Sequence, residues 1–323
     1  MSAVIVEAPA RLHLGVLDLG GRLGRRFGGI GAAIRQPSLR LVAEPAAAVA
    51  AEGPEAERLR QYAERFLANM PGARPARLRL VRAIPAHAGL GSGTQLGLAV
   101  ARAMATLAGL EADAPMLARA VGRGVRSAIG THTFAGGGFI LEGGRRPGGA
   151  GVAPLLGRWP MPAAWRYVVA IPSGPRGLSG EAEVAAFRTL PAPPDAEVAA
   201  VAHLVLMQLL PSLVEGDLAG FGQALTGVQR ITGGWFARSQ GGVYAPGPTA
   251  ELVEAFAEAG APGIGQSSWG PTAYAIVEGE AEAARLAGVA RAVLAGEGQV
   301  LHGSFDDRGA SAHSLASSRV TPD

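Results

Sequence analysis

The sequence predicts an α+β protein that folds as two domains. Its 323 residues are enough for two domains, and a hydrophobic content of 48% allows the chain to bury a sizeable core. Short segments that alternate apolar and polar residues, as strands do, are separated by longer apolar runs of helical length. In the second half, the order of these segments indicates an antiparallel sheet with helices on one face.

The first half is expected to begin with paired strands and to continue through helices that cover them. Alternating or apolar residues predict strands at residues 4–6 and 12–16, around Pro9, and at residues 30–34, 39–43, 78–82 and 136–144. Residues 54–70 carry Leu59, Tyr62 and Phe66 on one face and predict an amphipathic helix. Further helices are predicted at residues 96–110 and 115–125.

A domain boundary is predicted within residues 145–161, which are rich in glycine, proline and arginine, and we place the domains at 1–158 and 159–306. The second domain is expected to contain strands at residues 166–172, 273–277 and 299–302, and helices at 181–190, 198–214, 218–231, 249–259 and 280–294. Because residues 198–214 are almost entirely apolar, we expect that helix to be buried. Residues 307–323 turn polar and serine-rich and predict a flexible tail.

The composition excludes several kinds of chemistry. The chain has no cysteine, which rules out disulfides, cysteine–zinc sites and thiol nucleophiles, and no lysine, which rules out a lysine Schiff base. The net charge is only +3, without a basic block that interleaves aromatic residues, so we expect no nucleic-acid partner. The N-terminus lacks the features of a signal peptide, and no long apolar run is free of charges, proline and glycine. We therefore expect a cytoplasmic protein that is not inserted in a membrane.

A glycine-rich turn between a predicted strand and a predicted helix is the strongest local feature. Three glycines let the backbone approach a ligand closely, and the free N–H groups and dipole of the helix start favour an anion. We interpret the turn as a cradle for phosphate or diphosphate; the alternative is a capped helix after a tight turn. The lack of lysine excludes a Walker A motif. The predicted cradle residues are Gly89, Gly91, Ser92, Gly93, Thr94 and Gln95.

Several motifs together resemble the GHMP kinase superfamily and, within it, the β-ribofuranosylaminobenzene 5′-phosphate (RFAP) synthases of methanopterin biosynthesis. The resemblance covers most of the chain and rests on motifs at residues 11–19, 28–31, 89–95, 130–139 and 265–271. It implies a GHMP-kinase-like fold, with an N-terminal domain like domain 2 of ribosomal protein S5 and a ferredoxin-like C-terminal domain.

The resemblance also implies a reaction. The ring of 4-aminobenzoate or 4-hydroxybenzoate attacks C1 of phosphoribosyl diphosphate, and CO2 and diphosphate leave. A related family member with kinase activity would place a lysine in the first motif and an aspartate after the second helix. This chain has Arg11 and His13 in the first segment, and Thr131 and His132, without a carboxylate, in the second. The sequence therefore favours the synthase over an ATP-dependent small-molecule kinase or a non-catalytic binding protein of the same fold.

The resemblance suggests roles for the residues of these motifs. Arg11, His13, Thr131 and His132 are the predicted catalytic residues. Either histidine could hold the amino or hydroxyl group of the acid or take a proton as aromaticity returns; the alternative is a structural, hydrogen-bonded histidine. The implied cofactor is Mg²⁺ on the diphosphate, with Asp18 and then Glu142 as its predicted ligands, although Asp18 could equally be a turn residue.

Other residues are predicted to contact the substrates. Arg25 and Arg26 could bind phosphate or the aromatic carboxylate, or form a solvated turn, and Arg176 is a further candidate for the 5′-phosphate. The motif near residue 270 could supply phosphate ligands across the domain cleft and a ring, Trp269, that stacks on the aromatic acid or fills the core. Its predicted binding residues are Gln266, Ser267, Ser268 and Trp269. We expect small-molecule substrates and a homodimer.

Overall fold

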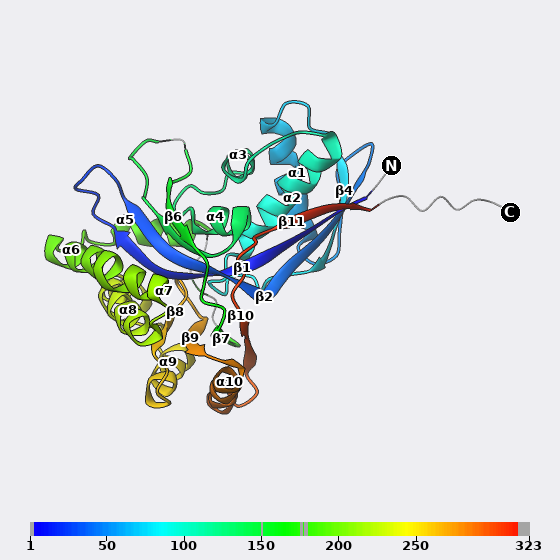
Figure 1. Ribbon diagram of the computed structural model, residues 1–323. Helices are drawn as coiled ribbons and strands as arrows, with labels where there is room; N and C mark the ends of the chain where they lie inside the picture. Colours follow the sequence, from blue (N-terminus) through cyan, green and yellow to red (C-terminus); the bar gives the residue numbers. More distant parts are fainter. Residues whose placement is uncertain (1–2, 150, 175–176, 178–179, 316–323) are drawn as a thin grey trace.

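A computed structural model of the chain describes residues 3–149, 151–174, 177 and 180–315. The predicted α+β class is confirmed, because the chain forms two sheets that are mainly antiparallel, with helices packed on them (Figure 1). Two parts of the sequence prediction, the phosphate ligand Arg176 and the tail at 316–323, lie outside the described residues.

The first sheet is built mainly from the N-terminal half. Its strands run in the order β11–β1–β2–β4–β3, with β5 paired to β2 and β6 paired to β5. Their bounds are β1 (Ala3–Asp18), β2 (Phe27–Pro45), β3 (Ala50–Glu52), β4 (Ala76–Arg82), β5 (Phe139–Glu142), β6 (Leu155–Trp159) and β11 (Ser311–Leu315). Helix α2 packs on β1 and β2, and α1 and α3 pack on α2. The helices of this half are α1 (Ala56–Asn69), α2 (Ser92–Ala108), α3 (Ala114–Ala120) and α4 (Ile129–Gly136).

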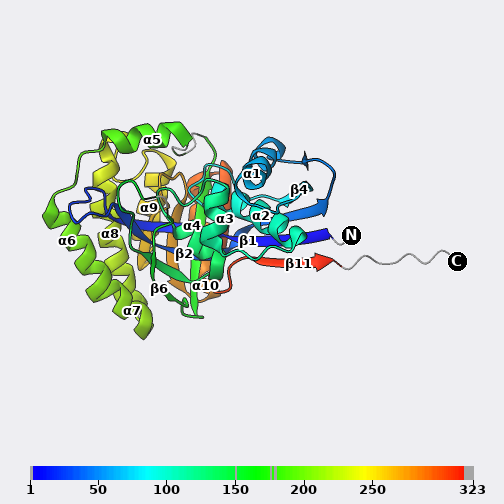
Figure 2. The ribbon, with the colours of Figure 1, turned by 90° about the horizontal axis from the view of Figure 1, so that it is seen from above.

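The second sheet has the order β10–β7–β9–β8 and carries helices on both faces, so the prediction of helices on one face is wrong. Its strands are β7 (Trp165–Pro172), β8 (Gly263–Gln266), β9 (Ala273–Glu278) and β10 (Gly298–Ser304). The helices are α5 (Gly180–Thr189), α6 (Asp195–Leu204), a π-helical turn η1 (Val205–Leu209), α7 (Leu210–Glu215), α8 (Leu218–Gln240), α9 (Pro248–Glu258) and α10 (Glu280–Leu294). Figure 2 shows α6, α7 and α8 side by side at the end of the molecule away from both termini.

Strand β7 faces two hydrophobic cores, and the larger of them joins the two halves of the chain. Tyr167 and Val169 belong to a large core that extends through both sheets, whereas Val168 and Ala170 pack in a smaller core under α9 and α10. Successive strand residues point to opposite faces, so a single strand serves both layers. Trp165 continues the large core against Phe221 of α8, with ring centroids 4.9 Å apart.

Some predicted elements have different bounds in the structure. The strands predicted on either side of Pro9 are one strand, β1, with a register irregularity between Pro9 and Ala10. The predicted boundary at 145–161 contains β6, which pairs with β5. Helix α4 and strand β8 were not predicted, because their glycine content weakens the local signal for either structure. Helix α8 continues to Gln240, beyond the predicted end at residue 231.

The prediction that residues 198–214 form a buried helix is wrong in part. Within α6, η1 and α7, a residue at every fourth position is buried along α8, namely Val201, Val205, Leu209 and Leu213, whereas the opposite face exposes Leu206, Met207 and Val214. The run Asp195–Glu215 passes a test for membrane spans by length and composition, with a mean hydropathy of 1.7. Passing this test is weak evidence for a membrane segment, since the core helix of a soluble protein can pass it too. In the structure the run packs on α8.

The predicted flexible tail is also wrong for the part that the structure describes. Residues Ser311–Leu315 form β11, which pairs antiparallel with the start of β1, from Ala3 opposite Leu315 to Glu7 opposite Ser311. Strand pairing uses backbone groups, so a polar segment can form it when an open sheet edge is available. This strand returns residues 311–315 to the first sheet.

Candidate functional site

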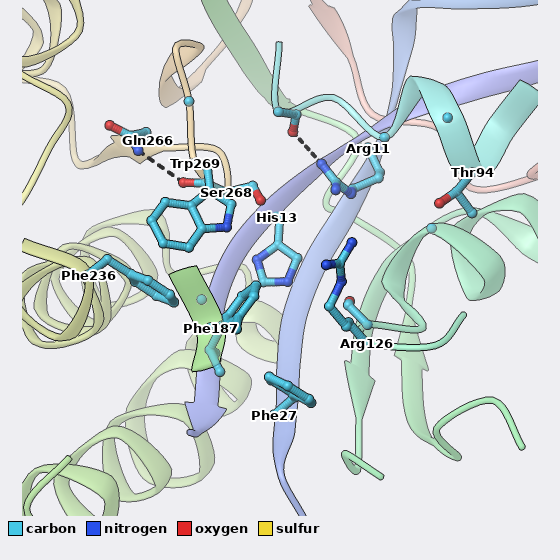
Figure 3. Close-up of a pocket in the computed structure, with 18 of the residues that line it drawn as sticks. Arg11, His13, Phe27, Thr94, Arg126, Phe187, Phe236, Gln266, Ser268 and Trp269 are labelled. Carbon is cyan, nitrogen blue, oxygen red and sulfur yellow. Dashed lines mark hydrogen bonds between the residues drawn. The ribbon is translucent and has the colours of Figure 1, made fainter. Parts of the chain in front are cut away.

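A cavity of about 460 Å³ lies between the glycine-rich turn, the second half of β1, the start of β2, and the segments around α8 and the β8–β9 turn. Figure 3 shows aromatic side chains on one side of His13, and Arg11, Arg126 and Thr94 on the other. The cavity thus has an aromatic end and a cationic end. Residues of the first and of the last motif recognised in the sequence both line this cavity.

The cationic end contains the predicted cradle. The loop after β4 ends at Gly91, which has φ 80° and caps α2, and the first three residues of the helix line the cavity. Five of the predicted cradle residues line the cavity: Gly89, Gly91, Ser92, Gly93 and Thr94. The sixth, Gln95, is buried behind them and donates a hydrogen bond to Gly130 O at 2.9 Å.

The cradle is held in place by the distant β8–β9 turn. Ser267 Oγ donates to Gly89 O at 2.7 Å and accepts from the backbone N of His13 at 3.0 Å. Thr272 Oγ1 donates to Ala88 O at 2.5 Å. Ser267, predicted to bind a substrate, does not line the cavity and instead ties three motifs together.

Gln266, Ser268 and Trp269 do line the cavity, as predicted for substrate contacts. The Gln266 amide is occupied on both sides, because Oε1 accepts from Ala245 N at 2.7 Å and Nε2 donates to Ser268 O at 3.0 Å. Its position is therefore fixed by the protein rather than left open for a ligand.

Three arginines surround the start of α2. Arg11 donates to Gly89 O beside the turn. A Cβ added at Gly93 would lie 2.9 Å from Nη2 of Arg58 and 3.2 Å from Nη2 of Arg123, so both guanidinium groups reach the helix start. Arg58 also pairs with Glu55 at 2.6 Å. Together with the helix dipole, this arrangement suits a highly charged anion such as diphosphate.

Sequence reasoning missed Arg58 and Arg123. Arg123 stands between Gly122 and Gly124 and lies 5.1 Å from the ring centroid of Tyr62, so its flanking glycines were a usable signal. Arg58 lies on a helix that looks like an ordinary amphipathic one, and no local pattern marks it.

Four aromatic rings form the other end of the cavity. Trp269 packs edge-on against Phe236 and Phe187, with ring centroids 4.8 and 5.5 Å apart, and Phe187 packs edge-on against Phe27 at 5.5 Å. Arg126 extends toward this group, with its guanidinium carbon 6.0 Å from the centroid of Phe187. Such rings suit a flat aromatic ligand. Trp269 was predicted from the sequence as a ring that could stack on the acid, whereas Phe27, Phe187 and Phe236 were not predicted.

His13 lies between the two ends and lines the cavity. Burial, together with the nearby charge of Arg11, lowers the pKa of His13 from 6.5 to about 3. The imidazole is therefore neutral at neutral pH, and it can donate or accept one hydrogen bond without adding charge.

The other two predicted catalytic residues do not reach the cavity lining. His132 is buried, and its Nε2 donates to Ala153 O at 2.9 Å; burial is also the main cause of its lowered pKa. Thr131 is fully buried next to it. The hydrogen bond of His132 fits the structural alternative, in which the ring holds the segment around Ala153 against α4.

The predicted metal ligands also lie outside the cavity lining. Asp18 Oδ1 accepts from Gly20 N at 2.6 Å and from Gly21 N at 3.0 Å, as a turn residue does. Glu142 accepts from Gly144 N at 2.7 Å and from Ala128 N at 3.3 Å, and burial raises its pKa to about 7. Within the described part of the chain, no group of three potential ligands is found, and no carboxylate lines the cavity. These residues do not fit a Mg²⁺ ion held by protein carboxylates.

The predicted arginine pair lies near the cavity but not in its lining. Arg25 donates to Gly144 O at 3.0 Å. Arg26 donates through Nε to Leu19 O at 3.0 Å, and its guanidinium carbon lies 5.5 Å from the ring centroid of Phe27. The pair therefore belongs to the rim next to the aromatic end.

Comparison with protein families matches both halves of the chain. Residues 56–138 match the family described as GHMP kinases N terminal domain, and residues 209–295 match GHMP kinases C terminal.

Curated relatives cover nearly the whole chain. A Methanothermobacter thermautotrophicus protein named beta-ribofuranosylphenol 5′-phosphate synthase is 34% identical over 328 residues, which cover 95% of this chain and 98% of the relative. A protein of the same name from Archaeoglobus fulgidus is 35% identical over 288 residues, covering 85% of this chain and 88% of the relative.

Solved structures share the fold at low sequence identity. Homoserine kinase from Cytophaga hutchinsonii has a TM-score of 0.74 and 16% identity, covering 96% of this chain and 97% of that chain. Mevalonate pyrophosphate decarboxylase from Streptococcus pyogenes has a TM-score of 0.65 and 13% identity, covering 95% and 97%. The predicted kinase-like fold is thereby confirmed.

Proposed function

Because this chain belongs to the GHMP kinase superfamily and, within it, to the family of β-ribofuranosylphenol 5′-phosphate synthases, we propose that it is a decarboxylating ribosyltransferase. Its substrates are phosphoribosyl diphosphate and 4-hydroxybenzoate, with 4-aminobenzoate as the alternative acceptor. Its products are the aryl riboside 5′-phosphate, CO2 and diphosphate, and the riboside enters methanopterin synthesis. The observation that carries the proposal is one cavity with a cationic end and an aromatic end.

The cationic end holds the leaving group. Diphosphate lies against the start of α2, where the helix N–H groups and Arg11, Arg58 and Arg123 surround its oxygens. As the bond from C1 to oxygen breaks, negative charge grows on the diphosphate, and donors fixed beforehand stabilise that charge. The loss of one such donor typically raises a barrier by about 3 kcal/mol.

The aromatic end holds the nucleophile. The benzoate ring lies among Phe27, Phe187, Phe236 and Trp269, and its carboxylate faces Arg126. The ring carbon that bears the carboxylate forms the new bond to C1 of the ribose. The bond from that carbon to CO2 then breaks, and its electron pair restores the aromatic ring.

The reaction, as written, requires no proton transfer to a base. CO2 leaves from the same carbon that attacks, so the reaction has no ring proton to remove. A cavity lining without a carboxylate among the described residues is compatible with such chemistry. His13, kept neutral by burial, adds no positive charge beside the sugar as positive charge develops there.

A kinase would need different residues. Phosphoryl transfer to an alcohol uses a group that orients or deprotonates the hydroxyl, commonly an aspartate. Arginine and histidine are the ionisable side chains among the described lining residues, so this lining offers no carboxylate for that role. The cavity lining therefore supports the synthase better than an ATP-dependent kinase.

Mg²⁺ and a homodimer remain predictions. We propose Mg²⁺ as a companion of the diphosphate on the strength of the family resemblance, and no step above depends on it. The exposed Leu206, Met207 and Val214 are the surface to examine first for a dimer contact.

The test is a release assay with carboxyl-labelled 4-hydroxybenzoate or 4-aminobenzoate. Incubation with phosphoribosyl diphosphate should release labelled CO2 and yield a riboside phosphate of the expected mass. Labelled CO2 should not appear when phosphoribosyl diphosphate is left out. ATP hydrolysis without CO2 release from either acid would favour the kinase instead.

A further inference from the structure

A second, smaller cavity of about 220 Å³ adjoins the main one. Its walls include Arg26, Arg145 and Arg146, and two residues, Phe27 and Val125, line both cavities. No aspartate or glutamate is among its described lining residues. Arginine is thus the charged residue type in the described lining of the second cavity, which lies directly beside the aromatic end.

Phe27 stands at the boundary between the cavities. Its φ of 72° is in the left-handed region, which bulky residues rarely adopt and which tends to occur at functional positions. One contact of its ring, at 5.5 Å, is to Phe187 in the main cavity. Another, also at 5.5 Å, is to the guanidinium carbon of Arg26 in the second cavity. The backbone thus holds an aromatic wall between the two spaces.

Arg145 shapes the far side of the second cavity. Its guanidinium donates to Val125 O and Gly149 O, and its backbone pairs with that of Arg26. These contacts bring the loop of Arg146 opposite the β1–β2 turn. Arg26 and Arg146 also line this cavity, one from the β1–β2 turn and the other from the loop opposite it.

The stereochemistry of the proposed reaction indicates which anion belongs there. Phosphoribosyl diphosphate is the α anomer, and the product named for the relatives is a β riboside, so the aryl ring attacks the face opposite the diphosphate. In a D-ribofuranose, C5 projects from that same β face. The 5′-phosphate therefore lies beside the aromatic end and away from the diphosphate cradle.

We propose that the second cavity is a phosphate-monoester subsite that holds the 5′-phosphate of the ribosyl substrate, with Arg26 and Arg146 as its ligands. This assignment rests on the proposed function. It separates the two anions of one substrate: diphosphate binds at the start of α2 with Arg58 and Arg123, and the monoester binds past Phe27. Each anion then fixes one side of the sugar, which leaves C1 facing the aromatic ring.

The experiment measures the binding of two probes, ribose 5-phosphate and inorganic diphosphate, by calorimetry. Arg26→Ala and Arg146→Ala should each weaken ribose 5-phosphate binding roughly tenfold and leave diphosphate binding within about twofold. Arg58→Ala should show the reverse pattern. Arg22→Ala, which removes an exposed arginine of the same β1–β2 segment that pairs with Asp195, is the matched control and should change neither.

Several outcomes would overturn the subsite. They are wild-type affinity for ribose 5-phosphate in either variant, equal weakening of both probes, and a loss found in Arg126→Ala instead. If the wild-type protein releases CO2 as proposed and both variants keep its KM for phosphoribosyl diphosphate, only the subsite fails. If the wild-type protein does not bind phosphoribosyl diphosphate, the proposed function fails.

Discussion

Gly89 shows at the scale of one residue why the cradle needs glycine. It has φ 76°, and a Cβ placed there would lie 2.1 Å from the carbonyl oxygen of Ser267. Its own carbonyl accepts hydrogen bonds from Arg11 and Ser267. A side chain at this position would push the β8–β9 turn away from the cradle, so the cost is both local strain and lost contacts between segments.

Gly89→Ala is therefore expected to weaken diphosphate binding by roughly tenfold or more, because the added methyl group displaces the turn that holds the cradle. Calorimetric titration with inorganic diphosphate measures this affinity. Gly288→Ala is the control: it lies in α10, where an added Cβ meets nothing within 4 Å, and it should bind normally. Normal diphosphate affinity in Gly89→Ala would contradict this account of the cradle.

His132 is a residue whose motif suggested catalysis and whose contacts suggest stability. His132→Ala leaves Ala153 O without its donor and is expected to lower the free energy of unfolding by about 1–3 kcal/mol. The turnover of the folded variant should stay within a few-fold of wild type. Denaturant unfolding and CO2 release measure the two quantities. Unchanged stability with a large loss of turnover would restore the catalytic interpretation.

At the scale of elements, Glu142 at the end of β5 links two segments that border the cavity. Its carboxyl group accepts from Ala128 N, just before α4, and from Gly144 N, beyond the strand. Burial is the main reason that its pKa rises from 4.5 to about 7, and its backbone hydrogen bonds limit the rise. The protonated form is therefore favoured in the folded protein relative to the unfolded chain.

A raised carboxyl pKa makes stability fall as pH increases. Between pH 4.5 and 7 the unfolded chain loses the proton of Glu142 while the folded protein keeps it, so this group costs stability at higher pH. From pH 5 to pH 8, the unfolding free energy of Glu142→Gln should therefore rise by roughly 3 kcal/mol relative to that of the wild-type protein. His13 gives the opposite slope below pH 6.5, but it is common to both proteins. A wild-type-to-variant difference that does not change with pH would refute the shift.

At the scale of the whole molecule, the site exists because distant segments close around one cavity. Ser267, in the second half, holds the backbone of both Gly89 and His13, in the first half. Residues 311–315 also cross back, since β11 pairs with β1 in the first sheet. The two halves therefore depend on each other for stability.

A chain that stops after Gly309 loses β11 and leaves the edge of β1 open. We expect its melting temperature to fall by several degrees, as a loss of 1 or 2 kcal/mol would cause in a protein of this size. Thermal unfolding followed by circular dichroism measures the change, and the full-length chain is the reference. An unaltered melting temperature would mean that β11 contributes little.

Much of the architecture could be read from local patterns. The alternation in β4, the glycine turn and the apolar run of α2 predicted a strand, a tight turn and a helix, and the structure has the same order. The burial of residues 198–214 and the strand in the tail were harder to predict. The burial of an apolar helix and the pairing of a polar strand depend on neighbours far along the chain. No local pattern contains that information.

The amino-acid sequence by itself determined the fold class, the family and the glycine-rich turn before α2, because turns, caps and glycine-dependent backbone angles are short-range properties. The tertiary structure alone decided which side chains share the cavity. It collected Phe27, Phe187 and Phe236 into an aromatic end, brought Arg58 and Arg123 to the start of α2, and turned His132 toward Ala153. The physical reason is that those contacts arise when hydrophobic burial packs distant segments together, and the direction of a side chain follows from that packing.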